Sequence, residues 1–349
     1  MEEKRIKVLT LGDMPLSTSG VGNQTKYVIE ALLASGKFEV FSLGGAMKHP
    51  QYQLIKTDKW GDLWKILPVD QFGTKEMVRS VVWREKPDIV WFMTDPRFWG
   101  WLWEMDNEIR QNIPMVYYHV WDNYPYPKYN KKFYESKHSG TLIFWFKEFL
   151  ERVGNDNAVL LMHTEPTDPN GPDLMQIVKD LELDKGQVLF SRDKIDEQKM
   201  ATLYNLADVT VNISDAEGFG LSCLESLACE TPVIGVRTGG LQDQLTDGKN
   251  VFGVMIEPSS QQIVGSQLVP YVMEDRINKQ DFLNAMQKMY DAGRDGRAKI
   301  GQQAKKHVSK NFNFEDFNNS WVELMSSIYE KHGSWETRKD YRSWRNESL

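Results

Sequence analysis

The chain has 349 residues, enough for two domains of ordinary size, since a single domain commonly holds roughly 100–200 residues. Hydrophobic residues make up 41% and charged residues 26%, as in a globular protein, and the net charge of −7 argues against wholesale electrostatic binding to nucleic acid or anionic lipid. No stretch has the roughly 18 to 20 apolar residues of a membrane span, and the N-terminus lacks the apolar region of a signal peptide. We therefore expect a cytoplasmic protein without a transmembrane segment.

Short apolar runs alternate with segments of helical period, which is the pattern of parallel strands joined by crossover helices. In the first half, strands are expected at 6–11, 38–43, 88–93 and 115–120, with helices near 21–34, 75–85 and 98–111. In the second half, strands are expected at 158–163, 187–190, 208–213, 232–236 and 252–256, with helices near 140–153, 173–181, 196–205 and 221–228. The fold class is α/β, with two doubly wound sheets in series.

The strand pattern stops at about residue 261, and three helical segments at 280–293, 297–311 and 313–332 follow. The last is amphipathic, so we expect it to be packed. For the tail 335–349, an arm laid on the other domain and a partly disordered segment are both open. We predict an N-terminal domain 1–136, a second domain 137–312, and a helix and tail 313–349 that pack back on the N-terminal domain.

The first strand is followed by a loop with Gly20 and Gly22 that leads into a helix. Glycines let backbone amides approach a phosphate, and the helix N-terminus adds a favourable dipole. The loop is not the dinucleotide fingerprint, because no third glycine follows three residues after Gly22. An anion site and a plain strand-to-helix turn both remain open.

Residues 207–228, ADVTVNISDAEGFGLSCLESLA, place a glycine-bracketed turn between a strand and a helix. Glu217 precedes the helix and Glu225 lies just over a turn inside it, while Cys223 falls in the same helix as an expected core residue. Amides at the turn can donate to phosphate or hydroxyl oxygens, and carboxylates can accept from sugar hydroxyls. The alternative is a capped helix whose acidic residues are favoured by the helix dipole, by about 0.3–1 kcal/mol each.

Continued by ETPVIG at 230–235 and TGGLQD at 238–243, this segment resembles the donor-binding half of the retaining family-4 glycosyltransferases, the glycosyl transferases group 1. Glu217 and Glu225 match the two-glutamate motif of that family in register. The resemblance is close over 187–254 and looser at 19–23 and in the terminal helix. It implies a GT-B fold, in which two Rossmann-like domains face each other across a cleft, and the transfer of a sugar from a nucleotide-diphosphate sugar, with a UDP-sugar as the first candidate.

The resemblance also assigns residues to the donor site, position by position. It implies that the donor sugar is contacted by Glu217, the amides of Gly218, Phe219 and Gly220, and the neighbouring Leu221, while Glu225 binds the ribose. It further implies that Gly20 and Gly22 approach the diphosphate and that Arg192 or Lys194 reaches the nucleobase. His119 is the candidate for a catalytic histidine beside the anomeric carbon, although a lone histidine at a strand end is more often structural.

The implied reaction retains the anomeric configuration and uses no metal or other cofactor. The leaving diphosphate is then stabilised by helix N-termini, backbone amides and basic side chains. The sequence contains no Asp-x-Asp pair and no histidine cluster with metal-ligand spacing, so a metal-free site is expected.

One segment departs from the family. Relatives open the second domain with a strand followed by an Arg and a Lys that bind the diphosphate, and no such strand is visible between 120 and 140. Lys137 is the candidate for the remaining end of that pair. Loss of the segment and a junction of two stretches at residues 136 and 137 both remain open.

The acceptor is not readable from the sequence and can be a glycan, a lipid, a protein or a small molecule; loops at 47–72 and 95–103 are expected to select it. A hydroxymethylated pyrimidine in DNA, as for some phage enzymes of this fold, is suggested by the aromatic and basic segment 124–134. A nucleotide-sugar epimerase or hydrolase and a noncatalytic nucleotide-sugar-binding module are further alternatives. An NAD-dependent oxidoreductase is disfavoured by the incomplete first glycine motif.

Overall fold

The structure is a computed structural model that describes residues 4–119, 139–168, 171–264 and 272–343. The chain forms two compact units, unit 1 from residues 1–121 and 312–349, and unit 2 from residues 122–311. The predicted domain boundary at 136 and 137, Lys137 itself and the segment 124–134 lie outside the described residues. Within the described residues, no helix has both the length and the apolar character needed to cross a membrane.

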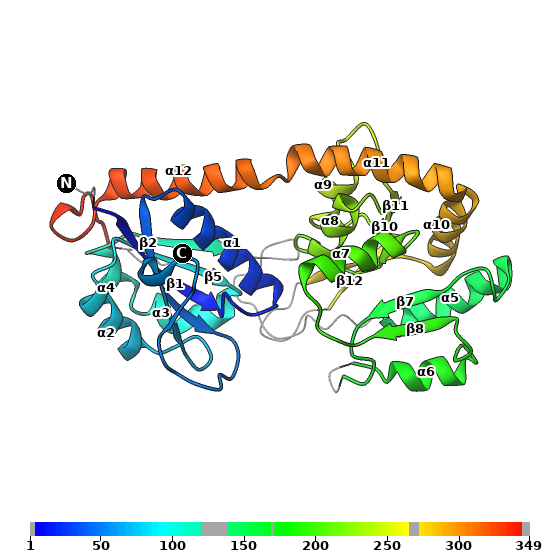
Figure 1. The fold of residues 1–349 in the computed structure, drawn as a ribbon, viewed down its shortest axis with the longest axis horizontal. Helices are drawn as coiled ribbons and strands as arrows, with labels where there is room; N and C mark the ends of the chain where they lie inside the picture. Colours follow the sequence, from blue (N-terminus) through cyan, green and yellow to red (C-terminus); the bar gives the residue numbers. More distant parts are fainter. Residues whose placement is uncertain (1–3, 120–138, 169–170, 265–271, 344–349) are drawn as a thin grey trace. The chain divides into compact units, whose positions relative to one another are not determined.

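Unit 1 is built on a six-stranded sheet with the order β3-β4-β2-β1-β5-β6 (Figure 1). The strands are β1 Ile6–Asp13, β2 Phe38–Gly45, β3 Ile55–Lys56, β4 Trp64–Pro68, β5 Ile89–Thr94 and β6 Met115–His119. All neighbours pair in parallel except β3 and β4. Every residue of β5 is buried, as expected for a strand covered on both faces.

Helices cover both faces of this sheet. They are α1 Gly20–Ala34, α2 Lys75–Glu85, α3 Gly100–Trp103, α4 Asp106–Arg110 and α12 Phe314–His332, with short 3-10 turns at Gly61–Leu63, Pro96–Trp99 and Trp335–Thr337. Neighbouring residues of β1 enter different cores, since Val8 packs with residues of α1 and α12, and Leu9 with residues of α2 to α4. In Figure 1, α12 in red runs beside α1 in blue, and the fully buried Met325 is its contribution to the core.

The chain after α12 is tied to unit 1 by hydrogen bonds. The Ser334 hydroxyl donates to Oδ1 of the buried Asp88 over 2.6 Å, and the Trp335 indole N–H donates to the carbonyl oxygen of Pro87 over 2.9 Å. Arg338 Nε donates to the carbonyl oxygen of Arg110 over 3.0 Å. The described part of the tail therefore packs on unit 1.

Unit 2 contains two parallel sheets and a hairpin. The strands are β7 Leu160–His163, β8 Val188–Ser191, β9 Thr210–Asn212, β10 Val233–Val236, β11 Val254–Ile256, β12 Ser260–Ile263 and β13 Met273–Arg276. The helices are α5 Ser139–Val153, α6 Leu174–Asp180, α7 Glu197–Leu206, α8 Leu221–Ala228, α9 Leu241–Leu245, α10 Lys279–Asp291 and α11 Gly293–Asn311. Strands β7 and β8 form one sheet, the order β11-β10-β9 forms the second, and β12 and β13 form the hairpin.

The two parallel sheets of unit 2 share one hydrophobic core, which includes Met162 of β7, Val188 of β8 and Ile234 of β10. In the common doubly wound order, the first strand lies between the second and the fourth. In that order, β7 and β8 correspond to the second and third strands, and β9, β10 and β11 to the fourth, fifth and sixth. The first strand would lie between β7 and β9, and no described strand lies there. The single second sheet that the sequence predicted is therefore divided in two among the described residues.

The predicted strands are all present, each with its ends within two residues of the prediction. The prediction that strands stop at about residue 261 was wrong, because β12 and β13 pair in antiparallel fashion. Both have polar sequences, SQQI and MEDR, and lack the alternation that marks a half-buried strand. The loop expected at 47–72 contains β3 and β4, and the helix expected at 98–111 is divided between α3 and α4.

Candidate functional site

The turn between β9 and α8 depends on a glycine at its end. Gly220 is the N-cap residue of α8 and has φ of 84°. This left-handed conformation favours glycine, and a Cβ atom at this position would also lie 2.6 Å from Cδ2 of Leu241. The turn that precedes α8 therefore requires Gly220 for both backbone and packing reasons.

A second glycine loop packs behind the turn. The amide of Gly240 donates to the carbonyl oxygen of Glu217 over 3.0 Å, and the side-chain amide of Gln244 donates to the carbonyl oxygen of Phe219. A Cβ atom on Gly239 would lie 1.8 Å from the carbonyl oxygen of Glu217. The carbonyl side of the turn is thus held against residues 239–244.

The amide side of the turn is in a different situation. Among the described hydrogen bonds, none uses the amide of Gly218 or of Gly220 as donor. The first amides of α8 add to them, because the first N–H groups of a helix have no acceptor within the helix. The turn thus presents backbone donors at a helix N-terminus, where the dipole favours anions and polar oxygens.

Glu217 and its neighbours line the turn. The Glu217 carboxylate is half-buried, and the side-chain amide of Asn212 at the end of β9 approaches its Oε2 at 3.5 Å. Phe219 is 42% exposed, and Leu221 begins α8 and is half-buried. The structure therefore brings Glu217, the turn and the start of α8 together in unit 2.

Cys223 and Cys229 are both unpaired, and Cys223 is completely buried. Burial raises the pKa of the Cys223 thiol to about 12, against a smaller lowering by a hydrogen bond with Asn212. Cys223 is therefore a neutral core residue under the turn, as its place in the sequence predicted, and not a nucleophile.

Glu225 lies just over one turn into α8 and is paired with Tyr204 of α7. The Tyr204 hydroxyl lies 3.0 Å from Oε2 of Glu225. Burial raises the pKa of Glu225, and the hydrogen bond from Tyr204 opposes this rise. Burial and the charge of Glu225 also raise the pKa of Tyr204, so the phenol stays protonated and is the donor.

Arg192 and Lys194 follow the carboxyl end of β8 and are exposed. Arg192 Nη2 lies 3.4 Å from the sulfur of Met175 in α6. Both are in unit 2, but on the sheet formed by β7 and β8, whereas the Glu217 turn follows the sheet that contains β9. Their prediction as nucleobase contacts stays a prediction.

In unit 1, the loop before α1 is closed on itself. Ser19 is the N-cap residue of α1; its hydroxyl accepts from the amide of Gly22 over 2.9 Å and donates to Oδ2 of Asp13 over 3.1 Å. A Cβ atom on Gly22 would lie 2.3 Å from the hydroxyl oxygen of Ser17. Gly22 is thus required by local packing, and its amide already has an acceptor, whereas Gly20 opens the helix.

Asp13 lies beside this loop, at the end of β1. Burial raises the pKa of its carboxyl group, while hydrogen bonds from Ser19 and Thr94 lower it to a lesser degree. An ionised carboxylate repels an anion, so the protonation state of Asp13 would matter for any anion held by this loop. The sequence did not single out Asp13, because an acidic residue after a strand has no distinguishing pattern.

His119 is the last residue of β6, and its side chain is exposed. Its ring lies 5.5 Å from the ring of Tyr117, whose hydroxyl donates to the carbonyl oxygen of Thr94 over 2.8 Å. His119, Gly20 and Gly22 belong to unit 1 and the other predicted site residues to unit 2. Their assignments to the substrate remain predictions.

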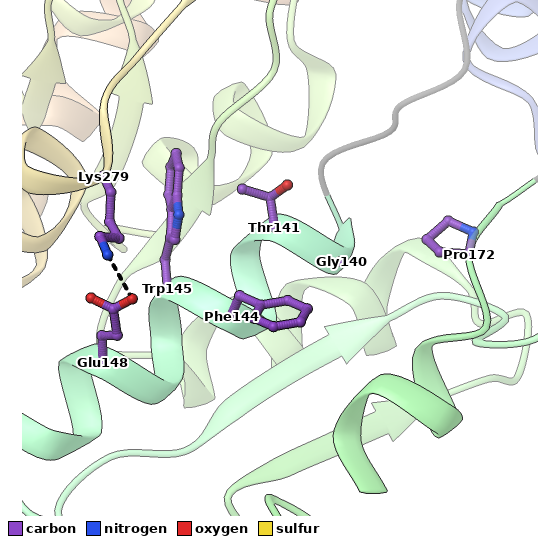
Figure 2. A pocket seen from close by; sticks show the side chains of 7 residues that line it. All are labelled: Gly140, Thr141, Phe144, Trp145, Glu148, Pro172 and Lys279. Carbon is purple, nitrogen blue, oxygen red and sulfur yellow. Dashed lines mark hydrogen bonds and ion pairs between the residues drawn. The ribbon is translucent and has the colours of Figure 1, made fainter. Parts of the chain in front are cut away.

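A separate shallow pocket of about 460 Å³ lies on unit 2, at the first turns of α5. Figure 2 shows its lining, Gly140, Thr141, Phe144, Trp145, Glu148, Pro172 and Lys279. The dashed line joins Lys279 Nζ and Glu148 Oε1, which lie 2.8 Å apart. None of the predicted site residues lines this pocket, so we do not assign the donor site to it.

No group of three or more His, Cys, Asp or Glu side chains within the described ranges is arranged to hold a metal ion. The metal-free site expected from the sequence stays a prediction.

Comparison with known proteins identifies the family of the segment that contains the turn. Residues 170–295 match the family model described as glycosyl transferases group 1. The D-inositol 3-phosphate glycosyltransferase of Streptosporangium roseum is 48% identical over 61 residues, which are 18% of this chain and 14% of that protein. The N-acetyl-alpha-D-glucosaminyl L-malate synthase of Bacillus anthracis is 27% identical over 125 residues, or 35% and 31% of the two chains. The matched segments thus span less than a third of these curated relatives.

Solved structures match over nearly the whole chain. A sucrose-phosphate synthase from Thermosynechococcus elongatus has a TM-score of 0.65 at 15% identity and covers 94% of this chain and all of that one. A glycosyltransferase from Rickettsia africae has a TM-score of 0.60 at 14% identity, with coverage of 94% and 100%. HepE of Anabaena, solved in complex with UDP, has a TM-score of 0.57 at 15% identity, with coverage of 92% and 100%. At these identities, the likeness shows the fold, which is GT-B, and residues 170–295 are similar to the glycosyl transferases group 1.

Proposed function

We propose that this protein is a retaining, metal-independent glycosyltransferase that moves a sugar from a nucleotide-diphosphate sugar to a hydroxyl acceptor. The observation that carries the proposal is the turn between β9 and α8. Residues 239–244 hold the carbonyl oxygens of Glu217 and Phe219, while the amides of the turn, its Glu217 carboxylate and the Glu225 carboxylate of α8 are available to a ligand. Curated relatives that match part of this chain are named as glycosyltransferases, which supports the same activity.

In this proposal, the donor is bound mainly by unit 2. Glu217 and the amides of Gly218 and Gly220 bind the hydroxyl groups of the sugar, since a carboxylate accepts and an amide donates hydrogen bonds. Glu225 binds the ribose through the oxygen that Tyr204 does not use. The N-terminus of α8 stabilises negative charge that develops on the leaving diphosphate, because its dipole and amides are already oriented.

A UDP-sugar is the first candidate donor. HepE of Anabaena, which shares the fold, has been solved with UDP and with UDP-glucose. The sequence lacks the Asp-x-Asp pair that binds a metal-diphosphate in other glycosyltransferases, which is why we propose metal-independent transfer. The acceptor can be a glycan, a lipid, a protein or DNA.

A thermal-shift screen over UDP-, GDP-, ADP- and TDP-sugars tests the donor site. A ligand at about 100 times its Kd stabilises the folded protein by about 2.7 kcal/mol, so the correct donor should raise the melting temperature clearly. Glu217→Ala and Glu225→Ala should reduce this shift, and Glu151→Ala, a change of an exposed glutamate on α5, should not. The proposal is wrong if no nucleotide sugar shifts the melting temperature, or if both site variants respond like the wild type.

Turnover separates transfer from its alternatives. A transferase releases the nucleoside diphosphate only when an acceptor is present, whereas a hydrolase or epimerase consumes the donor without one. Binding without any turnover, with every acceptor class tried, would indicate a noncatalytic nucleotide-sugar-binding module.

A further inference from the structure

The hairpin of β12 and β13 makes contact with the turn that carries Glu217. It connects β11 to α10, and neither of its strands pairs with the parallel sheets. The amide of Asp275 in β13 donates to the carbonyl oxygen of Asp215 over 3.0 Å. The Thr238 hydroxyl approaches the same oxygen at 3.5 Å. The backbone two residues before Glu217 is thus held by the hairpin.

Arg276, the last residue of β13, makes a denser set of contacts. Its Nη1 forms an ion pair with Oδ2 of Asp215, and its Nη2 donates to Oε2 of Glu274 over 2.8 Å. Its Nε donates to Oε1 of Gln262 over 3.1 Å, and Nη1 also donates to the carbonyl oxygen of Asp275 over 3.2 Å. The side chain of Arg276 is 26% exposed and those of Asp215 and Glu274 are each 16% exposed. These ion pairs are partly buried, and they differ in this from exposed surface ion pairs, which contribute little to the free energy of unfolding.

These contacts limit what Arg276 can do. A guanidinium group has five N–H donors, and four of them are used by Asp215, Glu274, Gln262 and the backbone of Asp275. Two carboxylates also offset its single charge. Arg276 is therefore poorly placed to bind a diphosphate directly, but well placed to fix Asp215 and to offset its charge.

We propose that Arg276 is a positioning residue for the sugar-binding turn, acting through Asp215 on Glu217 and the amides that follow it. The inference rests on the proposed function of the turn. The glycine loop 239–244 holds the turn at Glu217 and Phe219, and the hairpin holds it at Asp215. Because both supports are needed to fix the segment, loss of Arg276 displaces the groups that bind the sugar while the ribose site on α8 stays in place.

The experiment compares binding of UDP-glucose and of UDP by isothermal titration calorimetry. A loss of folding weakens both ligands equally, whereas displacement of the turn weakens UDP-glucose more, because only this ligand carries the sugar. Arg276→Met should raise the Kd for UDP-glucose by roughly 10-fold or more relative to the Kd for UDP, since small misplacements of binding groups are costly. Arg276→Lys, which keeps the charge but loses the planar fork, should be intermediate.

The matched control is Arg297→Met. Arg297 on α11 also combines an ion pair, 2.6 Å from Nη2 to Asp208 Oδ1, with a hydrogen bond to a backbone carbonyl, that of Met289 at 3.1 Å. It should lower the melting temperature without changing the ratio of the two Kd values. Asp215→Asn provides a second variant that removes the same ion pair if Arg276→Met does not fold.

Glu217→Gln, measured in the same series, separates the two hypotheses. If Glu217→Gln leaves the Kd ratio unchanged, the proposed function of the turn is wrong. If Glu217→Gln raises the ratio while Arg276→Met and Asp215→Asn both match Arg297→Met, only the positioning role of Arg276 is overturned.

Discussion

The hydroxyl of Tyr204 donates a hydrogen bond to Oε2 of Glu225 over 3.0 Å and thereby joins α7 to α8. One oxygen of the carboxylate proposed to bind ribose is thus fixed by the protein, and Oε1 has no hydrogen bond within the described residues. The carboxylate is held in one orientation before any ligand arrives, which lowers the entropic cost of binding.

Tyr204→Phe should weaken donor binding while it leaves the fold intact. Fixing a rotamer-rich side chain on binding costs about 0.5–1.5 kcal/mol, so loss of the fixed orientation should raise the Kd for a UDP-sugar roughly 2- to 13-fold. Glu225→Ala should have a larger effect on UDP-glucose than on its 2′-deoxyribose analogue, because one of the ribose hydroxyls is missing there. Equal effects on both ligands would contradict the assignment of Glu225 to the ribose.

The pH dependence of binding should follow Glu225. Burial raises the pKa of this carboxyl group above its ordinary value of 4.5. Donor affinity should therefore fall as the pH is lowered through this raised pKa, and Glu225→Gln should flatten the profile. Titration calorimetry between about pH 4.5 and 7.5 measures it.

The raised pKa of Glu225 affects the free energy of unfolding in the opposite direction from donor affinity. A carboxyl group whose pKa is raised by folding binds more protons in the folded state, so its contribution to the free energy of unfolding decreases as the pH rises from 4.5 through the raised pKa. Glu225→Gln should therefore increase the melting temperature of the unliganded protein at neutral pH and have little effect below pH 4.5. A loss of stability at neutral pH would contradict this expectation.

The glycines of the turn can be tested against a glycine with the same backbone conformation. Gly220 and Gly248 have φ of 84° and 85°, but a Cβ atom meets Leu241 at Gly220 and nothing within 4 Å at Gly248. Gly248→Ala should cost about 1–2 kcal/mol from backbone strain alone. Gly220→Ala should cost more, and Gly239→Ala, where the clash is with the Glu217 backbone, should cost most, at about 3 kcal/mol or above. Urea unfolding measures the order; equal costs at the three positions would contradict it.

The contact between Ser334 and Asp88 should make the tail important for the stability of unit 1. Asp88 is buried, and its two oxygens accept from the Ser334 hydroxyl and from the amide of Lys7 at 2.6 and 2.9 Å. Ser334→Ala removes the hydrogen bond from the Ser334 hydroxyl to Oδ1 of the buried Asp88. The free energy of unfolding in urea should therefore fall by about 1–3 kcal/mol. Ser343→Ala, at the exposed end of the described tail, should have no effect.

The elements that the sequence predicted well are those with a local pattern. The parallel strands appear as apolar runs, and α8 begins and ends where its glycine turn and helical period indicate. The hairpin was missed because its polar residues are fixed by contacts with Asp215, far away in the sequence, and not by their own pattern. For the same reason, the contacts of Tyr204 and Arg276 could not be predicted, whereas the proposed roles of Glu217 and Glu225 follow from a motif.

The loop before α1, which contains Gly22, shows a different limit of prediction from sequence. Gly22 was predicted to approach a phosphate, and the same lack of a side chain is required by the contact with Ser17. A glycine in a sequence shows that space is needed, but not whether a ligand or the chain itself uses it.

The close contact between Gly239 and the carbonyl oxygen of Glu217 has a mechanical consequence. No side chain fits between the two segments, and the amide of Gly240 bonds to the same oxygen over 3.0 Å, so neither segment can shift alone. A ligand that restrains the turn must also restrain α9, which begins directly after Gly240. Binding would then slow amide hydrogen exchange in α9, although α9 lies behind the turn. The rigidity of the turn would depend on residues that do not touch the ligand as well as on those that do.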